Sequence, residues 1–550
     1  MSLKPGAIGE IPAETVRIAR AAFPKGNLYM KMRDELGTFY QDQDFEKLFP
    51  KRGQPAQSPW RLALVSVMQF AEGLSDRQAA EAVRARIDWK YALGLELSDE
   101  GFDFSVLSEF RDRLLAGGAE QLLLNKMLEQ FKAKGLLKAG GKQRTDSTHI
   151  LAAARQLNRL ETVGETLRAA LNALAEANPD WLRKQISPQW IERYGRRIED
   201  YHLPKGKQQR EEYASQIGLD GFALLTALES DPQIEQLQQL SAVKILKHVW
   251  AHQYEQRDGK VQFRSKDDET EPVGNRINSP YDEEAHFGNK GNKTWLGYRV
   301  HITESCDEES AHLITDVKTT NATTSDVEIG EEIEKDLAQK QLLPTEHLMD
   351  GGYIDAKFIV NAQDQYGVTL IGPARSNNHW QKRIASGYDL TQFHIDWENK
   401  IASCPAGAKT TSWYPDKGKA GQEWIDIRFK KTDCRECSVR NQCTRSKNEP
   451  RELRLLPFAQ QQALQLAREK QTTDEWKKQY KVRAGIEGTI SQAVRAFDLR
   501  QSRYFGEAKT HLQNILIAVA VNLSRVISWL NEIPRAKTRT SKFAALATAI

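Results

Sequence analysis

Long apolar runs and cysteines are scarce in this sequence, and each absence excludes a class of protein. The longest apolar run, Ile515 to Val521, is too short to span a bilayer and is typical of a buried core segment. The N-terminus has no apolar stretch behind a basic start, which argues against a signal peptide. Five cysteines in 550 residues exclude a disulfide scaffold. We therefore expect a soluble, cytoplasmic protein.

Net charge is also scarce, although charged residues are common. They make up 28% of the chain, yet the formal net charge is only +4. No overall polycationic surface results, so any surface that binds nucleic acid must be local. The length suits about three or four domains with a substantial core, and no internal repeat is visible.

The first part of the chain, residues 1–138, is predicted to be mostly helical. Trp60 to Phe70 is an apolar helix, and Leu74 to Ala85 follows behind a capping motif. A further helix begins near Ser105 and is expected to turn Arg111 outward. Short helices with basic outer faces are typical of helix-turn-helix DNA-binding domains. A plain helical domain with solvated arginines explains the pattern equally well.

Segments that look like strands begin after residue 138. Lys142 to Ile150 (KQRTDSTHI) is predicted to be a strand that carries Asp146. Strand signals return at Trp295 to Ile302, and Ala311 to Val317 is expected to pair back as a hairpin. A later strand ends at Asp350, next to two glycines that leave room for an approaching phosphate.

A helical block, which we treat as an insertion, separates the first strand from the hairpin. Apolar residues recur in it at steps of three and four, and residues 257–280 after it are predicted to be a loop; the series is Leu160, Val163, Leu167, Leu171 and Leu174. Without it, the element order is β, ββ, α, β, α, β, α. This is the order of a ribonuclease H-like α/β core, in which the first strand, the fourth strand and a late helix converge. Asp146, Asp350 and Glu487 stand at these three positions.

Three converging carboxylates suit metal-dependent phosphoryl chemistry. Two Mg²⁺ ions roughly 4 Å apart need hard oxygen ligands. One ion activates the attacking water or 3′-hydroxyl, and the other stabilises the leaving oxygen. For the nearby His149 we favour a structural role, and Asp326 is placed at a helix start, where acids suit the helix dipole.

The stretch from Tyr480 to Lys509 is predicted to be helical and carries Glu487. Tyr480, Arg483 and Glu487 are spaced i, i+3 and i+7, which places them on one helical face. Such a face can hold a base, a phosphate and a metal. From spacing alone, an exposed helix with a local Arg–Glu pair is the simpler interpretation.

Several segments together resemble the DDE-type transposases of bacterial insertion sequences, in the branch with a Tyr-x2-Arg-x3-Glu-x6-Lys signature. The resemblance covers nearly the whole chain, and its two C-terminal segments are the most specific. The segments are LSDRQAAEAVRARIDWKYALGL, TDSTHI, SPYDEEAHFGNKGNKTWLGYRVHITESCD, MDGGY and RAGIEGTISQAVRAFDLRQSRYFGEAKT.

The resemblance implies roles for five residues. Asp146, Asp350 and Glu487 would be the catalytic triad and would hold two Mg²⁺ (or Mn²⁺) ions. Tyr480 and Arg483 would grip the DNA terminus through a base or its phosphates.

One position departs from the signature, because its lysine falls at Val494. Arg495, Arg500 and Arg503 are the candidates for the missing phosphate contact. Which of them supplies it is open, as is the release of the strand through a hairpin intermediate.

Four of the five cysteines cluster in a segment, residues 372 to about 455, that is predicted to be irregular and has little apolar content. Tetrahedral Zn²⁺ would hold such a loop in shape, and similar clusters occur in this branch of transposases. Reduced thiols in a small core are the alternative. Nearby arginines and a lysine could contact a DNA backbone or simply be solvated. The thiols are Cys404, Cys434, Cys437 and Cys443, and the basic residues are Arg435, Arg440, Arg445 and Lys447.

We therefore expect a Mg²⁺-dependent DNA transposase that binds terminal inverted repeats and performs cleavage and strand transfer. Its partners would be double-stranded DNA, as element ends and as target, and a second copy of the chain. It would associate with the nucleoid. The alternatives are a catalytically silent DNA-binding regulator derived from a transposase and a metal-dependent nuclease without strand transfer.

The predicted domains alternate between the catalytic core and insertions. They are a helical DNA-binding domain (1–138), the first part of the core (139–156 and 281–371), a helical insertion and linker (157–280), a zinc-binding insertion (372–455), core helices carrying Glu487 (456–532) and a basic tail (533–550).

Overall fold

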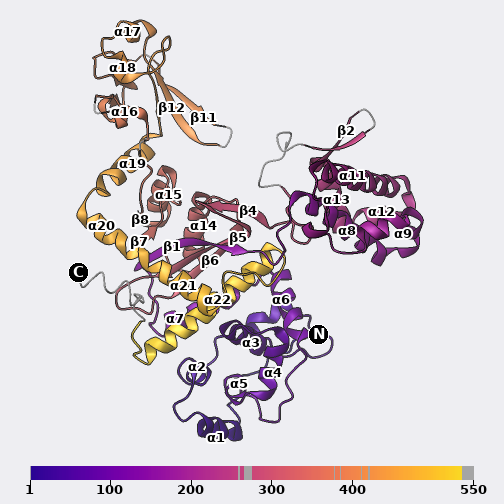
Figure 1. The fold of residues 1–550 in the computed structure, drawn as a ribbon. Helices are drawn as coiled ribbons and strands as arrows, with labels where there is room; N and C mark the ends of the chain where they lie inside the picture. The colour runs from indigo at the N-terminus through magenta and orange to yellow at the C-terminus, as the bar shows by residue number, and fades with distance from the viewer. Residues whose placement is uncertain are drawn as a thin grey trace, which may run out of the picture.

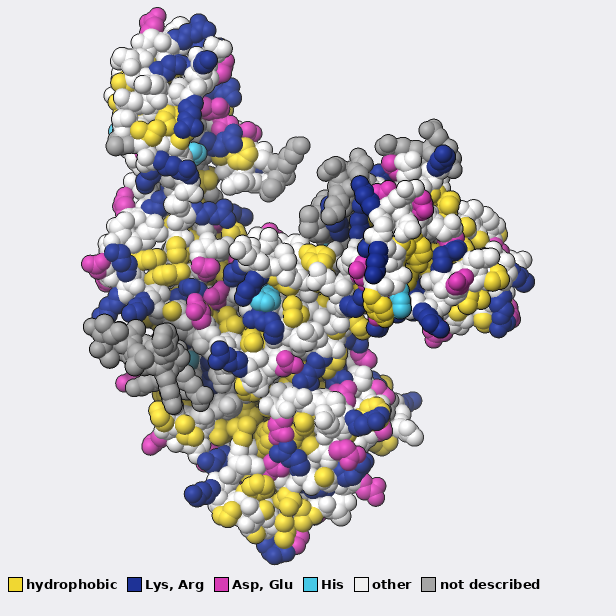
Figure 2. Space-filling view, in the orientation of Figure 1, with side chains coloured by type: hydrophobic (Ala, Val, Ile, Leu, Met, Phe, Trp, Pro, Cys, Tyr) yellow, Lys and Arg dark blue, Asp and Glu magenta, His cyan; other side chains and the backbone are white. Residues whose placement is uncertain are grey.

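The computed structural model describes residues 2–257, 260–264, 276–376, 378–384, 386–410, 412–418 and 421–535. Parts of the predicted linker and of the insertion around the cysteines, and nearly all of the predicted basic tail, lie outside these residues. The chain forms a mixed α/β body from which two arms project (Figure 1). One arm is the helical insertion and the other contains the cysteines. Figure 2 shows a hollow between the two arms.

A six-stranded mixed sheet lies in the body. Its strands follow the order β4-β5-β1-β7-β8, and β6 also pairs with β5. β1 is antiparallel to β5 and parallel to β7, which is parallel to β8. The predicted strands are confirmed, whereas β4 was not predicted. The bounds are β1 Lys142–Leu151, β4 His286–Lys290, β5 Lys293–Ser305, β6 Ile314–Asn321, β7 Glu346–Met349 and β8 Thr369–Ile371.

Successive side chains of β1 point to opposite faces of the sheet, as strand geometry requires. Arg144 and Asp146 contact the segment that leads into α21 (Gly485–Ala496). Thr145 and Ser147 belong to polar networks that end on α14 (Asp326–Gln339). Asp326 is the first residue of α14, as predicted. α15 (Ala356–Tyr366) packs beside α14.

The helices of the N-terminal region, apart from the first, share one hydrophobic core with the sheet. The long helix α22 (Glu507–Leu530) joins them, because it packs against α3, α7 and β6. The capping motif at Ser75 is present. The region's α-helices are α1 Ala13–Ala22, α2 Leu28–Leu36, α3 Pro59–Glu72, α4 Asp76–Ala85, α5 Ile87–Leu93, α6 Ser105–Ala116 and α7 Leu122–Ala133.

The outward orientation predicted for Arg111 is wrong. Its side chain is buried, and Nη1 donates to Oδ1 of Asp76 at 2.9 Å. The guanidinium also lies over the Tyr504 ring, 5.3 Å from its centroid. A helical spacing cannot reveal this partner, because Asp76 lies on another helix.

Among the described residues, α22 alone is long and apolar enough to cross a membrane by length and composition. Its most apolar window is 78% buried inside the protein, as in the core helix of a globular fold. The run from Ile515 to Val521 lies within it and is buried, as predicted.

The helical arm has a separate hydrophobic core. Leu160, Leu167 and Leu174 of the predicted leucine series are buried in it. Strands β2 (Tyr254–Arg257) and β3 (Lys260–Phe263) form a hairpin at the start of the expected loop. Its α-helices are α8 Arg159–Ala177, α9 Pro179–Gln185, α10 Pro188–Tyr194, α11 Lys207–Ser230, α12 Glu235–Gln238 and α13 Ser241–Gln253.

The arm with the cysteines contains short elements rather than the irregular chain that we expected. They surround a small core that includes Phe393, Ile427 and Leu453. The elements are α16 Trp380–Arg383, β9 His394–Asp396, β10 Ile401–Ser403, β11 Tyr414–Lys417, β12 Glu423–Arg428, α17 Lys431–Arg435, α18 Arg440–Cys443 and β13 Glu452–Leu455.

The single helix predicted from Tyr480 to Lys509 is broken. α19 (Phe458–Lys470) and α20 (Asp474–Lys481) precede a 3₁₀ turn, Val482–Ala484, and α21 then ends at Ala496. Asp498 takes a positive φ of 55°. Ser502 N–H then donates to the carbonyl of Leu151 at the end of β1. This tertiary pairing replaces the helix that local sequence favours, so Arg500 and Arg503 lie outside it.

Candidate active site

The three predicted acids lie on three elements that meet beside the sheet. Asp146 is in β1, and Asp350 directly follows β7, its parallel neighbour. The register pairs Thr145 with Met349, so each aspartate directly follows one member of a matched pair on adjacent parallel strands. Glu487 is in the first turn of α21.

The guanidinium of Arg483 lies among these acids. Its Nη1 is 2.8 Å from Oδ2 of Asp146, and its Nη2 is 4.0 Å from Oε1 of Glu487. Burial lowers the pKa of Arg483, but the Tyr480 phenolate that forms at high pH and the carboxylates of Asp146 and Asp350 raise it overall. The guanidinium carbon is 5.5 Å from the centroid of the Tyr480 ring. The predicted face therefore persists across the helix break.

The carboxylates differ in their surroundings. Burial raises the pKa of Asp146 overall. Three groups act in the opposite direction: the Ser147 N–H, which donates to the Asp146 carboxylate at 2.7 Å, and the positive charges of Arg483 and Lys290. Asp350 accepts from the N–H of Gly351 at 2.8 Å. The Glu487 side chain is 70% exposed, whereas that of Asp146 is 13% exposed.

Tyr480 stacks on a second aromatic residue, Trp476, with ring centroids 4.8 Å apart. Both pack against a small apolar cluster that includes Leu348 and Ile371. Burial raises the pKa of the Tyr480 phenol, so it stays protonated at neutral pH.

The candidate phosphate contacts separate into different environments. Arg495 is exposed. Arg500 donates to Thr148 at 3.0 Å and to the carbonyl of His149. Arg503 donates to the carbonyl of Leu74 at 2.8 Å and lies over the ring of Phe70. Val494 packs against the main core, so its side chain suits this position better than a lysine would.

His149 faces away from Asp146, because an odd separation along a strand reverses the face. Its ring lies against Trp295, with centroids 5.1 Å apart. Burial and the charge of Arg500 lower the pKa of His149 to about 4, so the ring is neutral at pH 7. These contacts agree with a structural role.

Sequence reasoning missed the side-chain contacts that residues near Asp146 on β1 and β5 make. Ser147 Oγ donates to Asp326 at 3.2 Å, and Arg299 donates to the same oxygen at 2.9 Å. Arg144 lies two residues before Asp146 and pairs with Glu304. The alternation of polar residues along β1 could have indicated that their side chains make contacts on both faces of the sheet. It could not have identified their partners, because these come from distant segments of the chain.

The four clustered thiols line one cavity of about 270 Å³ in the arm. Burial raises the pKa of Cys443 to about 11, and the charges of the other three thiols act on it. Within the part of the chain that the structure describes, however, no three His, Cys, Asp or Glu side chains are arranged to hold a metal ion.

The basic residues near the thiols are only partly available to DNA. Arg440 donates to the carbonyls of Cys434, Ser446 and Glu449, so it stabilises the loop. Arg445 lies over the ring of Trp380 at 4.7 Å but is exposed. Arg435 and Lys447 are exposed.

Comparison with protein families gives two matches. A family model described as Transposase domain (DUF772) matches residues 17–113, and one described as Transposase DDE domain matches residues 403–527. The second match contains Glu487 and all four clustered cysteines. Comparisons with curated proteins and with solved structures found no match. The two family matches support a DDE-type transposase of an insertion sequence, with one match near the N-terminus and the other in the C-terminal part of the chain.

Proposed function

We propose that the protein binds the terminal inverted repeats of its element and catalyses metal-dependent DNA cleavage and strand transfer. The proposal includes a ribonuclease H-like core. Support comes from the order β6-β5-β1-β7-β8, in which the first three strands of this core are antiparallel and the last two run parallel to β1.

The observation that carries the proposal is that Arg483 pairs with Asp146 and lies near Glu487. Nη1 of Arg483 is 2.8 Å from Oδ2 of Asp146 and its Nη2 is 4.0 Å from Oε1 of Glu487. The charge of Asp350, which follows the strand next to that of Asp146, also raises the pKa of Arg483. An all-oxygen donor set is what Mg²⁺ or Mn²⁺ requires. These carboxylates would hold two such ions after Arg483 turns away and Glu487, which is exposed, moves inward.

Bound divalent ions would supply activation of the attacking oxygen and stabilisation of the leaving oxygen. The chain's own residues would hold the DNA end in line. Arg483 would exchange the carboxylate of Asp146 for a phosphate, and Tyr480, backed by Trp476, would stack on a terminal base. Arg495 is the exposed candidate for the phosphate contact that the signature lysine makes.

The other parts of the chain receive roles in the same proposal. Residues 1–138 would contact DNA, and two chains would act together on two element ends in the cytoplasm. The cysteines would hold a structural Zn²⁺, for which four thiols around one cavity are suitable donors. These thiols would have to rearrange for tetrahedral binding, because the structure does not arrange three of them to hold a metal ion.

Purified protein incubated with labelled terminal-repeat DNA and Mg²⁺ tests the proposal. We expect nicked ends followed by joined products. Cleavage without joining would favour the nuclease alternative, and binding without cleavage would favour the silent regulator.

A further inference from the structure

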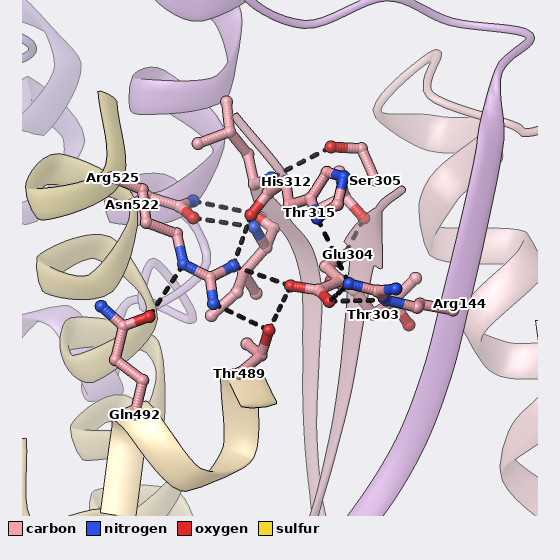
Figure 3. A network of polar contacts seen from close by, with 12 residues as sticks. Arg144, Thr303, Glu304, Ser305, His312, Thr315, Thr489, Gln492, Asn522 and Arg525 are labelled. Carbon is pink, nitrogen blue, oxygen red and sulfur yellow. Dashed lines mark hydrogen bonds and ion pairs between the residues drawn. The ribbon is translucent and has the colours of Figure 1, made fainter. Parts of the chain in front are cut away.

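A fully buried carboxylate lies behind α21. Glu304 of β5 is 0% exposed, and both of its oxygens have charged partners. Oε1 is 2.6 Å from Nη2 of Arg144, and Oε2 is 2.7 Å from Nη1 of Arg525. The arginines belong to β1 and α22, so one carboxylate joins three elements (Figure 3).

The same network holds α21 at two places. Thr489 Oγ1 donates to Oε2 of Glu304 at 2.6 Å and accepts from Arg525 at 2.7 Å. Arg525 also donates to Gln492 of α21 at 3.0 Å. Arg144 donates to the carbonyl of Val482, in the turn before α21, at 2.6 Å. Figure 3 shows these side chains pointing toward one another.

The geometry relates this network to both ends of the candidate site. Arg144 lies two residues before Asp146 on the same face of β1. Thr489 lies two residues after Glu487, about 200° around the helix, so it faces inward while Glu487 faces outward. A shift of the network therefore moves the carboxylate of Glu487 relative to that of Asp146.

We propose that Glu304, Arg144, Arg525 and Thr489 form a positioning device that fixes the helix of Glu487 against the strand of Asp146. The inference rests on the proposed function for its catalytic consequence. Polar groups that are buried and mutually satisfied resist displacement, because moving any one leaves the others unpaired.

Thr489→Val and Thr489→Ser provide the test, since valine keeps the shape of threonine and serine keeps its hydroxyl. A misplacement near 1 Å lowers turnover by about 10². We expect Thr489→Val to lower kcat for DNA cleavage by about 10- to 100-fold at unchanged KM. Thr489→Ser should stay close to wild type. Hydrogen exchange at the amides of residues 486–496 should accelerate in the valine variant only.

A matched control separates positioning from general stability. Asp220 of the helical arm is also buried, and it accepts from Arg193 and from the hydroxyl of Tyr194. Asp220→Asn should leave kcat unchanged, whereas Glu304→Gln should lower it. Equal kcat and equal exchange in the two Thr489 variants would overturn the inference. Absence of cleavage by the wild type would instead overturn the proposed function, and the exchange comparison would still decide the anchoring of α21.

Discussion

Replacing Gly485 with alanine should destabilise the protein, although alanine is the better helix former. A Cβ at this position would lie 2.0 Å from Nη1 and 2.4 Å from Cζ of Arg144. Arginine ends are normally free to move aside. The guanidinium of Arg144, however, is ion-paired with Glu304 and donates a hydrogen bond to the carbonyl of Val482, and its side chain is only 6% exposed. An alanine at this position must therefore either break the Arg144–Glu304 ion pair or displace α21 from its packed position.

The magnitude follows from two opposing effects. Displacing one partner of a buried ion pair costs about 3–5 kcal/mol, and replacing glycine with alanine in a helix returns about 1 kcal/mol. We expect a net loss of about 2–4 kcal/mol for Gly485→Ala. Gly488 of the same helix is a matched control, because its Cβ would meet nothing within 4 Å. Gly488→Ala should stabilise the protein by up to about 1 kcal/mol.

Urea unfolding monitored by circular dichroism provides the assay, with hydrogen exchange in α21 as a local measure. The two variants should move in opposite directions from the wild type. If Gly485→Ala were as stable as Gly488→Ala, the guanidinium of Arg144 would be free to move, and the reasoning about the buried network would be refuted.

Three further outcomes test other parts of the account. Cys434→Ser should reduce bound zinc from one ion per chain to near zero by elemental analysis, and equal zinc would contradict the proposed site. Burial, and then the charge of Glu284, raises the pKa of Glu507 to about 7 from an ordinary 4.5. The stability that protonated Glu507 contributes is therefore lost as the pH rises through about 7. Glu507→Gln should raise the thermal midpoint of the protein at pH 8 and leave it nearly unchanged at pH 4. A larger increase at pH 4 than at pH 8 would refute this prediction. Arg503→Ala removes the hydrogen bond to the carbonyl of Leu74 and should lower the free energy of unfolding, measured in urea, by about 1–2 kcal/mol. An unchanged free energy of unfolding would show that this contact does not stabilise the protein.

Much of the fold could be predicted from local pattern. Alternation gave the strand from Trp295 to Ile302, and helical spacing gave the buried leucines of the insertion. These signals work because burial of one face imposes a period on the sequence. The convergence of Asp146, Asp350 and Glu487 on one metal site was predicted from element order and from the family resemblance, and it stays a prediction.

Other features depend on contacts between distant segments and leave no local period. The break after Ala496 results from pairing with the end of β1 near Leu151. Arg111 is drawn inward by Asp76. Arg500, a candidate for DNA binding, donates instead to the backbone of β1. The Glu304 network was missed for the same reason, since its members come from two strands and two helices.

The central claim is that Glu487 completes a metal-dependent nucleotidyl-transfer site with Asp146 and Asp350. Strand transfer from labelled terminal repeats in Mg²⁺ tests it most directly, comparing the wild type with Glu487→Gln. Glu475→Gln is the control, because Glu475 is an exposed acid on the preceding helix α20. We predict that Glu487→Gln abolishes joined products while DNA binding and the control remain unchanged. Full strand transfer by Glu487→Gln would contradict the account.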